Sequence, residues 1–110
     1  MPAVELLYWE GCPSHPETLR DLRAALDELG HPEQAITLTL IETEQQAAEH
    51  GFIGSPTLRI GGVDPLPPPP DEPTGLTCRV YRRRDGRYSA TPDPDDLRDA
   101  LRQLLPTKED

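Results

Sequence analysis

The chain has 110 residues, a formal net charge of −9, 35% hydrophobic residues and 5% aromatic residues. This length fits a single compact domain with a modest core. The negative charge argues against a nucleic-acid partner, because binding phosphates requires a basic surface. The sequence has no signal-peptide pattern after Met1 and no apolar run near the ~18 residues of a membrane span. We therefore expect a cytoplasmic protein with no membrane partner.

The first third of the chain predicts a strand, a turn and a helix. Residues 3–8 are short and mostly apolar, as in a central strand, and residues 9–13 form the turn. Ser14 and Glu17 have capping-box spacing, which predicts the start of a helix that ends near Gly30. The buried stripe of this helix is expected to contain Leu19, Leu22, Leu26 and Leu29.

The middle of the chain adds a strand, a short helix and another strand. Residues 35–41 alternate and are rich in β-branched types, so they predict a strand. A short helix is expected from Thr43 to His50, again with capping-box spacing, and Gly51 ends it. Pro56 then stands before a third strand, which ends at a glycine turn. The proline-rich residues at about 61–75 are expected to form a semi-rigid loop insertion.

The last third predicts a fourth strand and a final helix. Residues 76–82 alternate, which predicts a strand with Leu76, Cys78 and Val80 on its buried face. Asp93 is the expected N-cap of the last helix. The apolar face of that helix is expected to hold Leu97, Leu101, Leu104 and Leu105. We expect one α/β domain over residues 1–106, in the order βαβαββα, with a frayed tail at 107–110.

Cys12 is the residue on which the functional hypothesis depends. It lies on the turn between the first strand and the first helix. The unpaired N–H groups at a helix N-terminus favour the thiolate, which is the reactive form of cysteine. His15, three residues later, can favour the thiolate when protonated or accept the proton when neutral. The pattern therefore predicts Cys12 as a nucleophile tuned by His15.

Two motifs in this order resemble the thioredoxin-like superfamily. Trp9-Glu10-Gly11-Cys12-Pro13-Ser14-His15 resembles its redox turn, with His15 in place of the second cysteine of C-x-x-C. Gly54-Ser55-Pro56-Thr57 is similar to its loop with a cis-proline. The resemblance implies a thioredoxin-like fold with a mixed central sheet flanked by helices. It also implies that Ser55 and Pro56 dock the substrate. Trp9 and Pro13, on the turn itself, are further candidate substrate-binding residues.

The Cys12-Pro13 pair also resembles the active-site pattern of glutaredoxins that work with a single cysteine. This likeness implies an oxidoreductase that exchanges disulfides through Cys12 alone. Its partner would be a protein or small thiol, with glutathione as the candidate co-substrate. We expect no resident cofactor and no metal ion, and the sequence gives no oligomeric state.

Two other hypotheses for the function of Cys12 stay open. Cys78 is a candidate second thiol that could form a disulfide with Cys12, or hold a soft metal or an organomercurial with it. Against this, an antiparallel fourth strand would place the two cysteines more than ~10 Å apart at ~3.3 Å per residue. Two cysteines in a cytoplasmic chain are also expected to be free thiols. The third reading is a binding module of the same fold without catalysis.

Overall fold

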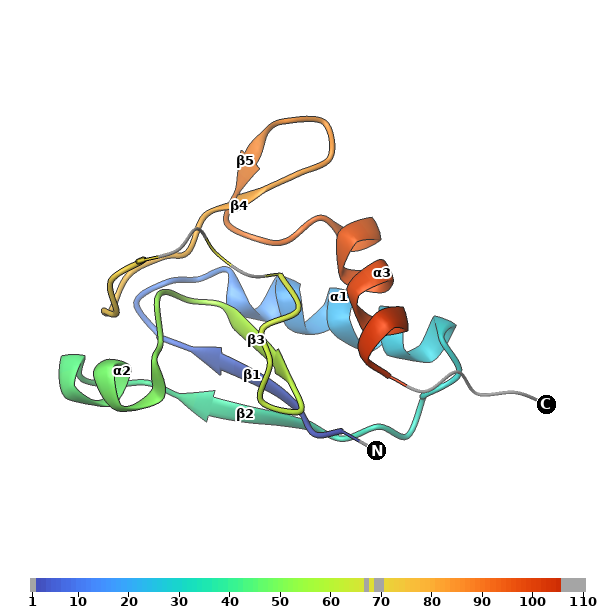
Figure 1. The fold of residues 1–110 in the computed structure, drawn as a ribbon, viewed down its shortest axis with the longest axis horizontal. Coiled ribbons are helices and arrows are strands. Elements are labelled where there is room, and N and C mark those ends of the chain that lie inside the picture. Colours follow the sequence, from blue (N-terminus) through green and yellow to red (C-terminus); the bar gives the residue numbers. More distant parts are fainter. Residues whose placement is uncertain (1, 67, 69–70, 106–110) are drawn as a thin grey trace.

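The computed structural model describes residues 2–66, 68 and 71–105. They form a mixed α/β fold (Figure 1). The elements in chain order are β1 (Val4–Tyr8), α1 (His15–Glu28), β2 (Ile36–Leu40), α2 (Glu44–His50), β3 (Thr57–Ile60), β4 (Tyr81–Arg82), β5 (Tyr88–Ser89) and α3 (Pro94–Leu104). Residue 106, where the domain is expected to end, and the expected frayed tail at 107–110 lie outside the described residues. Within these residues, every helix is too short or too polar to cross a membrane.

A three-stranded mixed sheet lies at the centre of the fold. Its order is β2-β1-β3, with β2 parallel to β1 and β3 antiparallel to it. Val4 of β1 is opposite Ile36 on one side and Ile60 on the other. This arrangement confirms a mixed sheet and places the turn after β1 at the same end as the segment before β3.

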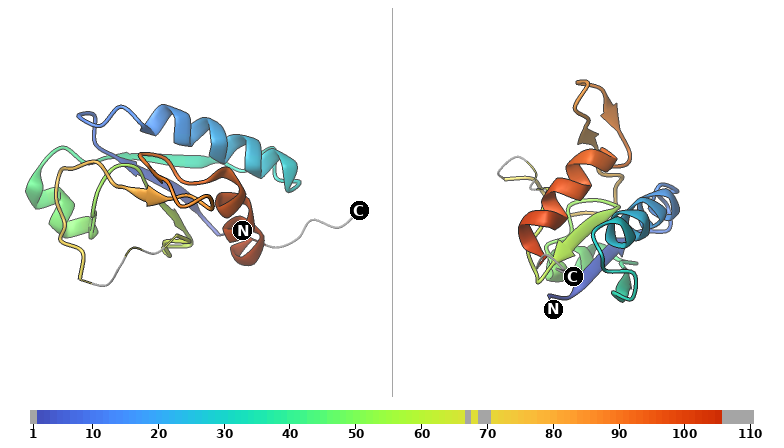
Figure 2. Two further views of the ribbon diagram at one scale, coloured as in Figure 1. Left: turned by 90° about the horizontal axis from the view of Figure 1, so that it is seen from above. Right: turned by 90° about the vertical axis from the view of Figure 1, so that its right-hand side faces the viewer.

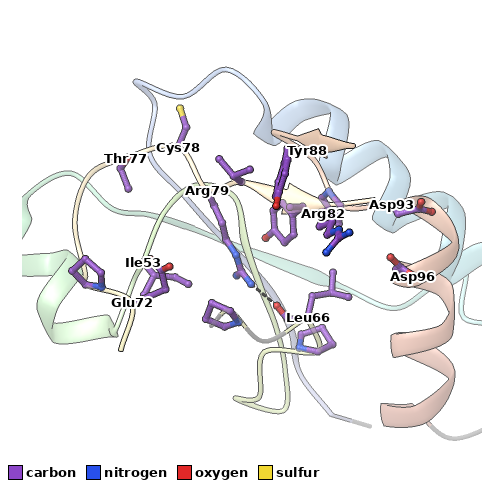
Figure 3. Close-up of a pocket in the computed structure, with 16 residues that line it drawn as sticks. Ile53, Leu66, Glu72, Thr77, Cys78, Arg79, Arg82, Tyr88, Asp93 and Asp96 are labelled. Atoms are coloured by element: carbon purple, nitrogen blue, oxygen red, sulfur yellow. Dashed lines mark hydrogen bonds between the residues drawn. The ribbon is translucent and has the colours of Figure 1, made fainter. Parts of the chain in front are cut away.

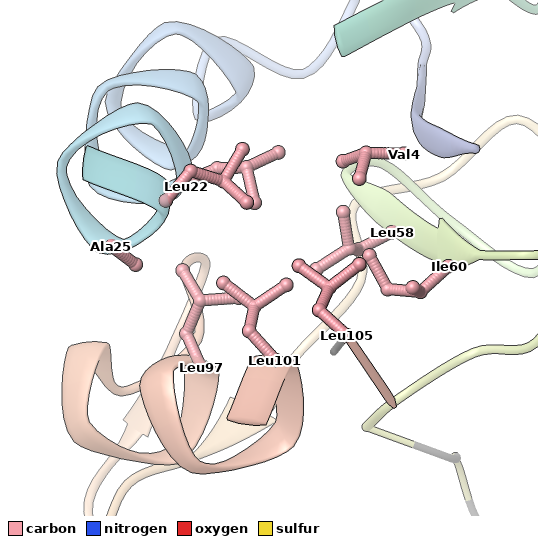
Figure 4. Packing of buried hydrophobic residues seen from close by; sticks show 9 residues of the cluster. Val4, Leu22, Ala25, Leu58, Ile60, Leu97, Leu101 and Leu105 are labelled. Atoms are coloured by element: carbon pink, nitrogen blue, oxygen red, sulfur yellow. The ribbon is translucent and has the colours of Figure 1, made fainter. Parts of the chain in front are cut away.

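The main core lies between this sheet and two helices, α1 and α3. The leucine stripe of α1 faces that of α3, and both point toward side chains of β1 and β3 (Figure 4). Leu22, Leu26, Leu97 and Leu101 are completely buried, which confirms the centre of each expected stripe. Leu29 and Leu104, at the helix ends, are only partly buried and pack against this cluster.

A second, smaller cluster forms where α2 packs at the end of the sheet. It contains Leu7, Ile41, Ala47 and Phe52, with Trp9 and Leu76 partly buried against it. The start of α2 is capped as expected, because Thr43 Oγ1 accepts a hydrogen bond from the backbone N–H of Gln46 at 3.0 Å. Gly51 ends the helix in the left-handed conformation, at φ 63°. Through Trp9 and Phe52, the cluster supports the turn that contains Cys12 and the segment that contains Ser55.

The expected fourth strand over 76–82 is wrong in extent and in its faces. Only Tyr81–Arg82 is a strand, and it pairs with Tyr88–Ser89 in a separate two-stranded hairpin. The hairpin projects from the body of the fold (Figure 1; Figure 2, right). Arg79 and Tyr81 are buried, whereas Cys78 and Val80 are exposed. The side chains still alternate, but the opposite face of the segment points inward.

The N-terminus of α1 also differs from the expected capping box. Ser14 is the N-cap residue, yet its side chain makes no capping hydrogen bond. Its backbone adopts αR angles, at φ −84° and ψ −12°, whereas a capping serine usually has extended angles. The Ser14 hydroxyl is therefore available for another contact, which lies in the candidate site.

Candidate functional site

Cys12 and Cys78 are joined by a disulfide bond, with their Cα atoms 5.5 Å apart. This spacing is ordinary for a disulfide. The expected separation of more than ~10 Å is therefore wrong, and so is the expectation of two free thiols. Cys78 was expected on a buried strand face with Leu76 and Val80. Its side chain instead reaches the turn after β1, where it bonds to Cys12.

The backbone of Ser55 explains why the two cysteines meet. Its N–H donates to the carbonyl of Thr77 and its own carbonyl accepts from the N–H of Arg79, both at 2.8 Å. Residues 77–79 therefore run parallel to the segment before β3, rather than antiparallel to β3 itself. Since that segment lies at the Cys12 end of the sheet, this pairing brings Cys78 to Cys12.

Gly54 allows the close approach of these two segments. Its φ is +151°, a conformation that L side chains rarely adopt. A Cβ at this position would lie 3.0 Å from the N, Cα and Cβ atoms of Arg79. The glycine before Ser55 thus has a structural role that the sequence motif alone did not reveal.

The two bonded cysteines differ in exposure. Cys12 is 1% exposed, whereas Cys78 is among the exposed residues. Of the two bonded residues, Cys78 is therefore the one that faces solvent. The predicted nucleophile, Cys12, is thus the buried member of the pair.

Two polar groups lie near the Cys12 sulfur. Ser14 Oγ is 3.3 Å from Cys12 Sγ and can donate a hydrogen bond to it. The carbonyl oxygen of Ser55 is 3.5 Å from the same sulfur. Because the bonded sulfur carries no proton, the second contact becomes a hydrogen bond only when Cys12 is reduced to a thiol. The Ser14 hydroxyl, which does not cap α1, can stabilise Cys12 as a thiolate.

His15 contacts the backbone of Cys12. Its Nδ1 is 3.3 Å from the Cys12 carbonyl oxygen, which requires a proton on Nδ1. The ring also stacks on Tyr8, with centroids 4.3 Å apart. These contacts orient the imidazole and support the turn, so a direct action of His15 on the sulfur stays a prediction.

The other expected substrate-contacting residues surround the turn. The backbone N–H of Trp9 donates to Ser55 Oγ at 3.0 Å, and the Trp9 ring lies against Gly11. Pro13 is exposed at the start of α1. The Ser55–Pro56 bond is cis, as expected, and both residues are buried. The structure thus brings Trp9, Ser55 and Pro56 together beside Cys12.

A groove of about 790 Å³ lies on the other side of residues 77–82 (Figure 3). Proline-rich residues form one wall, and the start of α3 closes one end. The Arg79 guanidinium, 6% exposed, points toward this wall, whereas the Cys78 sulfur points away from it (Figure 3). Arg79 donates to Asp64 Oδ2 at 2.7 Å and to the carbonyl of Leu66.

Tyr81 completes the buried polar contacts beside the groove. Its hydroxyl donates to the Pro56 carbonyl, and its ring lies 4.5 Å from the Arg79 guanidinium carbon. Burial raises the pKa of Tyr81, and Asp64 raises it further, against the opposing effect of Arg79. Tyr81 therefore remains a neutral hydrogen-bond donor. Sequence reasoning missed Arg79 and Tyr81 because it placed the opposite face of this segment inside.

The described residues contain no group of three or more His, Cys, Asp or Glu side chains arranged to hold a metal ion. Comparison of the chain with protein-family models, curated proteins and solved structures gives no significant match.

Proposed function

We propose that this chain is a thioredoxin-like domain that exchanges thiols and disulfides through a reversible Cys12–Cys78 bond. The observation that carries the proposal is a cysteine pair with Cα atoms 5.5 Å apart, in which Cys12 is buried and Cys78 is exposed. The turn before α1 and the cis-proline segment beside it support the same assignment. The second cysteine comes from the segment after the proline-rich loop, rather than from the C-x-x-C position held by His15.

The unequal exposure gives the exchange a direction. A partner thiolate attacks the sulfur of Cys78, forms a mixed disulfide with it and displaces Cys12 as a thiolate. The Ser14 hydroxyl at 3.3 Å stabilises this leaving sulfur. A second partner thiolate then attacks the partner's sulfur in the mixed disulfide and releases Cys78. Two electrons and two protons pass from two partner thiols to the cysteine pair, and the partner leaves as a disulfide.

Glutathione is the simplest partner for this exchange, since two molecules reduce the pair and leave as glutathione disulfide. A protein dithiol would serve equally. The backbone of Ser55, which the family resemblance assigns to substrate docking, is already bonded to Thr77 and Arg79 of the same chain. An extended partner segment would therefore use Ser55 only after residues 77–79 move away.

The test is an equilibrium titration in glutathione redox buffers, followed by acid quenching, alkylation and mass spectrometry. We expect a two-electron transition that either Cys12→Ser or Cys78→Ser abolishes. Cys12→Ser should accumulate glutathione on Cys78, whereas Cys78→Ser should leave the buried Cys12 largely unmodified. A reduction potential below about −300 mV would mark a structural bond and overturn the proposal.

A soft-metal function is a second candidate, favoured by the same 5.5 Å spacing. After reduction, two adjacent thiolates suit a two-coordinate soft cation or an organomercurial. Titration of the reduced protein with phenylmercuric acetate, with free thiols counted throughout, tests it. Tight binding that protects both cysteines, in a protein whose disulfide does not exchange with glutathione, would favour this candidate. If the reduced protein neither exchanges nor binds the mercurial, a non-catalytic binding module remains.

A further inference from the structure

Arg79 is the most extensively bonded side chain near the cysteine pair. Although cationic, it is only 6% exposed, a burial that requires paired and hydrogen-bonded surroundings. Its Nη1 lies 2.7 Å from Asp64 Oδ2 and 3.4 Å from Thr57 Oγ1, and its Nη2 donates to the Leu66 carbonyl. The guanidinium also lies over the ring of Tyr81.

These contacts connect Arg79 to several separate parts of the chain. Thr57 belongs to β3, Asp64 and Leu66 belong to the proline-rich segment, and the Arg79 N–H donates to Ser55 before β3. Asp64 is itself fixed, because its other oxygen accepts from the Leu66 N–H at 2.8 Å. The Arg79 side chain is thus held by a preformed set of acceptors.

Cys78 precedes Arg79 in an extended segment, so the two side chains point to opposite sides (Figure 3). Fixing the guanidinium on one side fixes the direction of the Cys78 side chain on the other. None of these Arg79 contacts with described residues involves a sulfur atom. They can therefore persist after the disulfide is reduced.

We propose that Arg79 is a positioning residue that holds reduced Cys78 beside Cys12 and thereby sets the equilibrium of the disulfide. The biological meaning of this inference rests on the proposed function. Its physical basis is the effective concentration of the Cys78 thiol beside Cys12. When the segment stays in place, the two thiols close to a disulfide as an intramolecular pair. When the segment is released, the reduced form gains conformational freedom and closure becomes less favourable.

The test compares the reduction potentials of wild type, Arg79→Lys, Arg79→Ala and Arg82→Ala. Arg82 is an exposed arginine in β4 and serves as the matched control. Lysine keeps the charge but lacks the fork that reaches two acceptors at once. We expect both Arg79 variants to weaken disulfide formation, with Arg79→Ala weakening it about tenfold, or about 30 mV for this two-electron couple. The equilibrium constant for disulfide formation in Arg82→Ala should remain within twofold of wild type.

Urea unfolding of the oxidised and reduced forms separates positioning from general stability. A purely structural Arg79 would lower both unfolding free energies equally and leave the potential unchanged, because the two forms and their unfolding make one thermodynamic cycle. We expect Arg79→Ala to lower the stability of the oxidised form more than that of the reduced form. Equal losses of stability, with the equilibrium constant for disulfide formation within twofold of wild type, would overturn the inference.

The two proposals can fail separately. Dithiothreitol buffers extend the measurement to bonds that glutathione does not reduce, so the effect of Arg79 is measured even for a structural disulfide. A wild-type bond that resists glutathione overturns the proposed function. A bond that titrates normally while both Arg79 variants match wild type overturns only the role of Arg79.

Discussion

Replacing Gly54 by alanine tests the close packing that brings Cys78 to Cys12. The new Cβ would lie 3.0 Å from the N, Cα and Cβ atoms of Arg79, so part of the clash is with backbone. The φ of +151° is also strained for alanine. Strain of this kind costs about 1–3 kcal/mol, and overpacking costs a further ~1–3 kcal/mol. We therefore expect Gly54→Ala to lower the free energy of unfolding by about 2–6 kcal/mol.

Gly62→Ala provides the matched control. Its φ of +83° is also positive, but a Cβ there would meet no atom within 4 Å. Only the backbone cost of about 1–2 kcal/mol should remain. Urea unfolding of both oxidised variants, monitored by Trp9 fluorescence and far-UV circular dichroism, measures the difference. Equal losses of stability in the two variants would refute the close approach of Gly54 to Arg79.

Three further predictions concern Tyr81, Asp93 and Leu26. Burial raises the pKa of Tyr81 above its ordinary value of 10.0. The free energy of unfolding of wild type should therefore fall as the pH rises above 10, where Tyr81 ionises in the unfolded chain. Tyr81→Phe should remove that part of the fall and, because it loses the hydrogen bond to the Pro56 carbonyl, cost about 1 kcal/mol at neutral pH. Backbone hydrogen bonds from Arg84 and Asp95 hold the pKa of Asp93 below 3.8. Asp93→Ala should therefore cost about 1 kcal/mol at pH 7 in urea titrations, and this difference should shrink as the pH falls below 3.8. Leu26→Ala, at a completely buried position, should cost about 2–5 kcal/mol in the same assay; a loss below 1 kcal/mol would contradict the core described above.

Periodicity predicted much of the scaffold because helices and strands that bury one face repeat that face in sequence. The leucines of α1 and α3 are examples, since their spacing alone indicated which side packs inward. Residues 76–82 show where this logic fails. An alternating segment has two faces, and the sequence assigned the core to Leu76, Cys78 and Val80 on hydrophobicity. The structure buries Arg79 and Tyr81, because Asp64 and two backbone carbonyls satisfy their polar groups.

The cysteine pairing was missed for a related reason. The expectation assumed that residues 76–82 would join the sheet as a fourth strand antiparallel to β3. The pairing partner is the backbone of Ser55, outside the regular strand, and the segment runs parallel to it. Local patterns cannot identify such a partner, because it depends on where the proline-rich segment returns the chain. Ser14 was misjudged similarly, since a capping hydroxyl and a sulfur-directed one have the same local sequence.

The covalent link between residues 12 and 78 also encloses most of the secondary structure. Its 66-residue span includes α1, β2, α2 and β3, whereas β1, the hairpin and α3 lie outside. In the chain-entropy model, a ring of this size removes configurational entropy equivalent to about 4 kcal/mol from the unfolded chain. Oxidised molecules should accordingly survive heat and proteases better than reduced ones. The thiol balance of the surroundings would then govern how long each copy of the protein lasts.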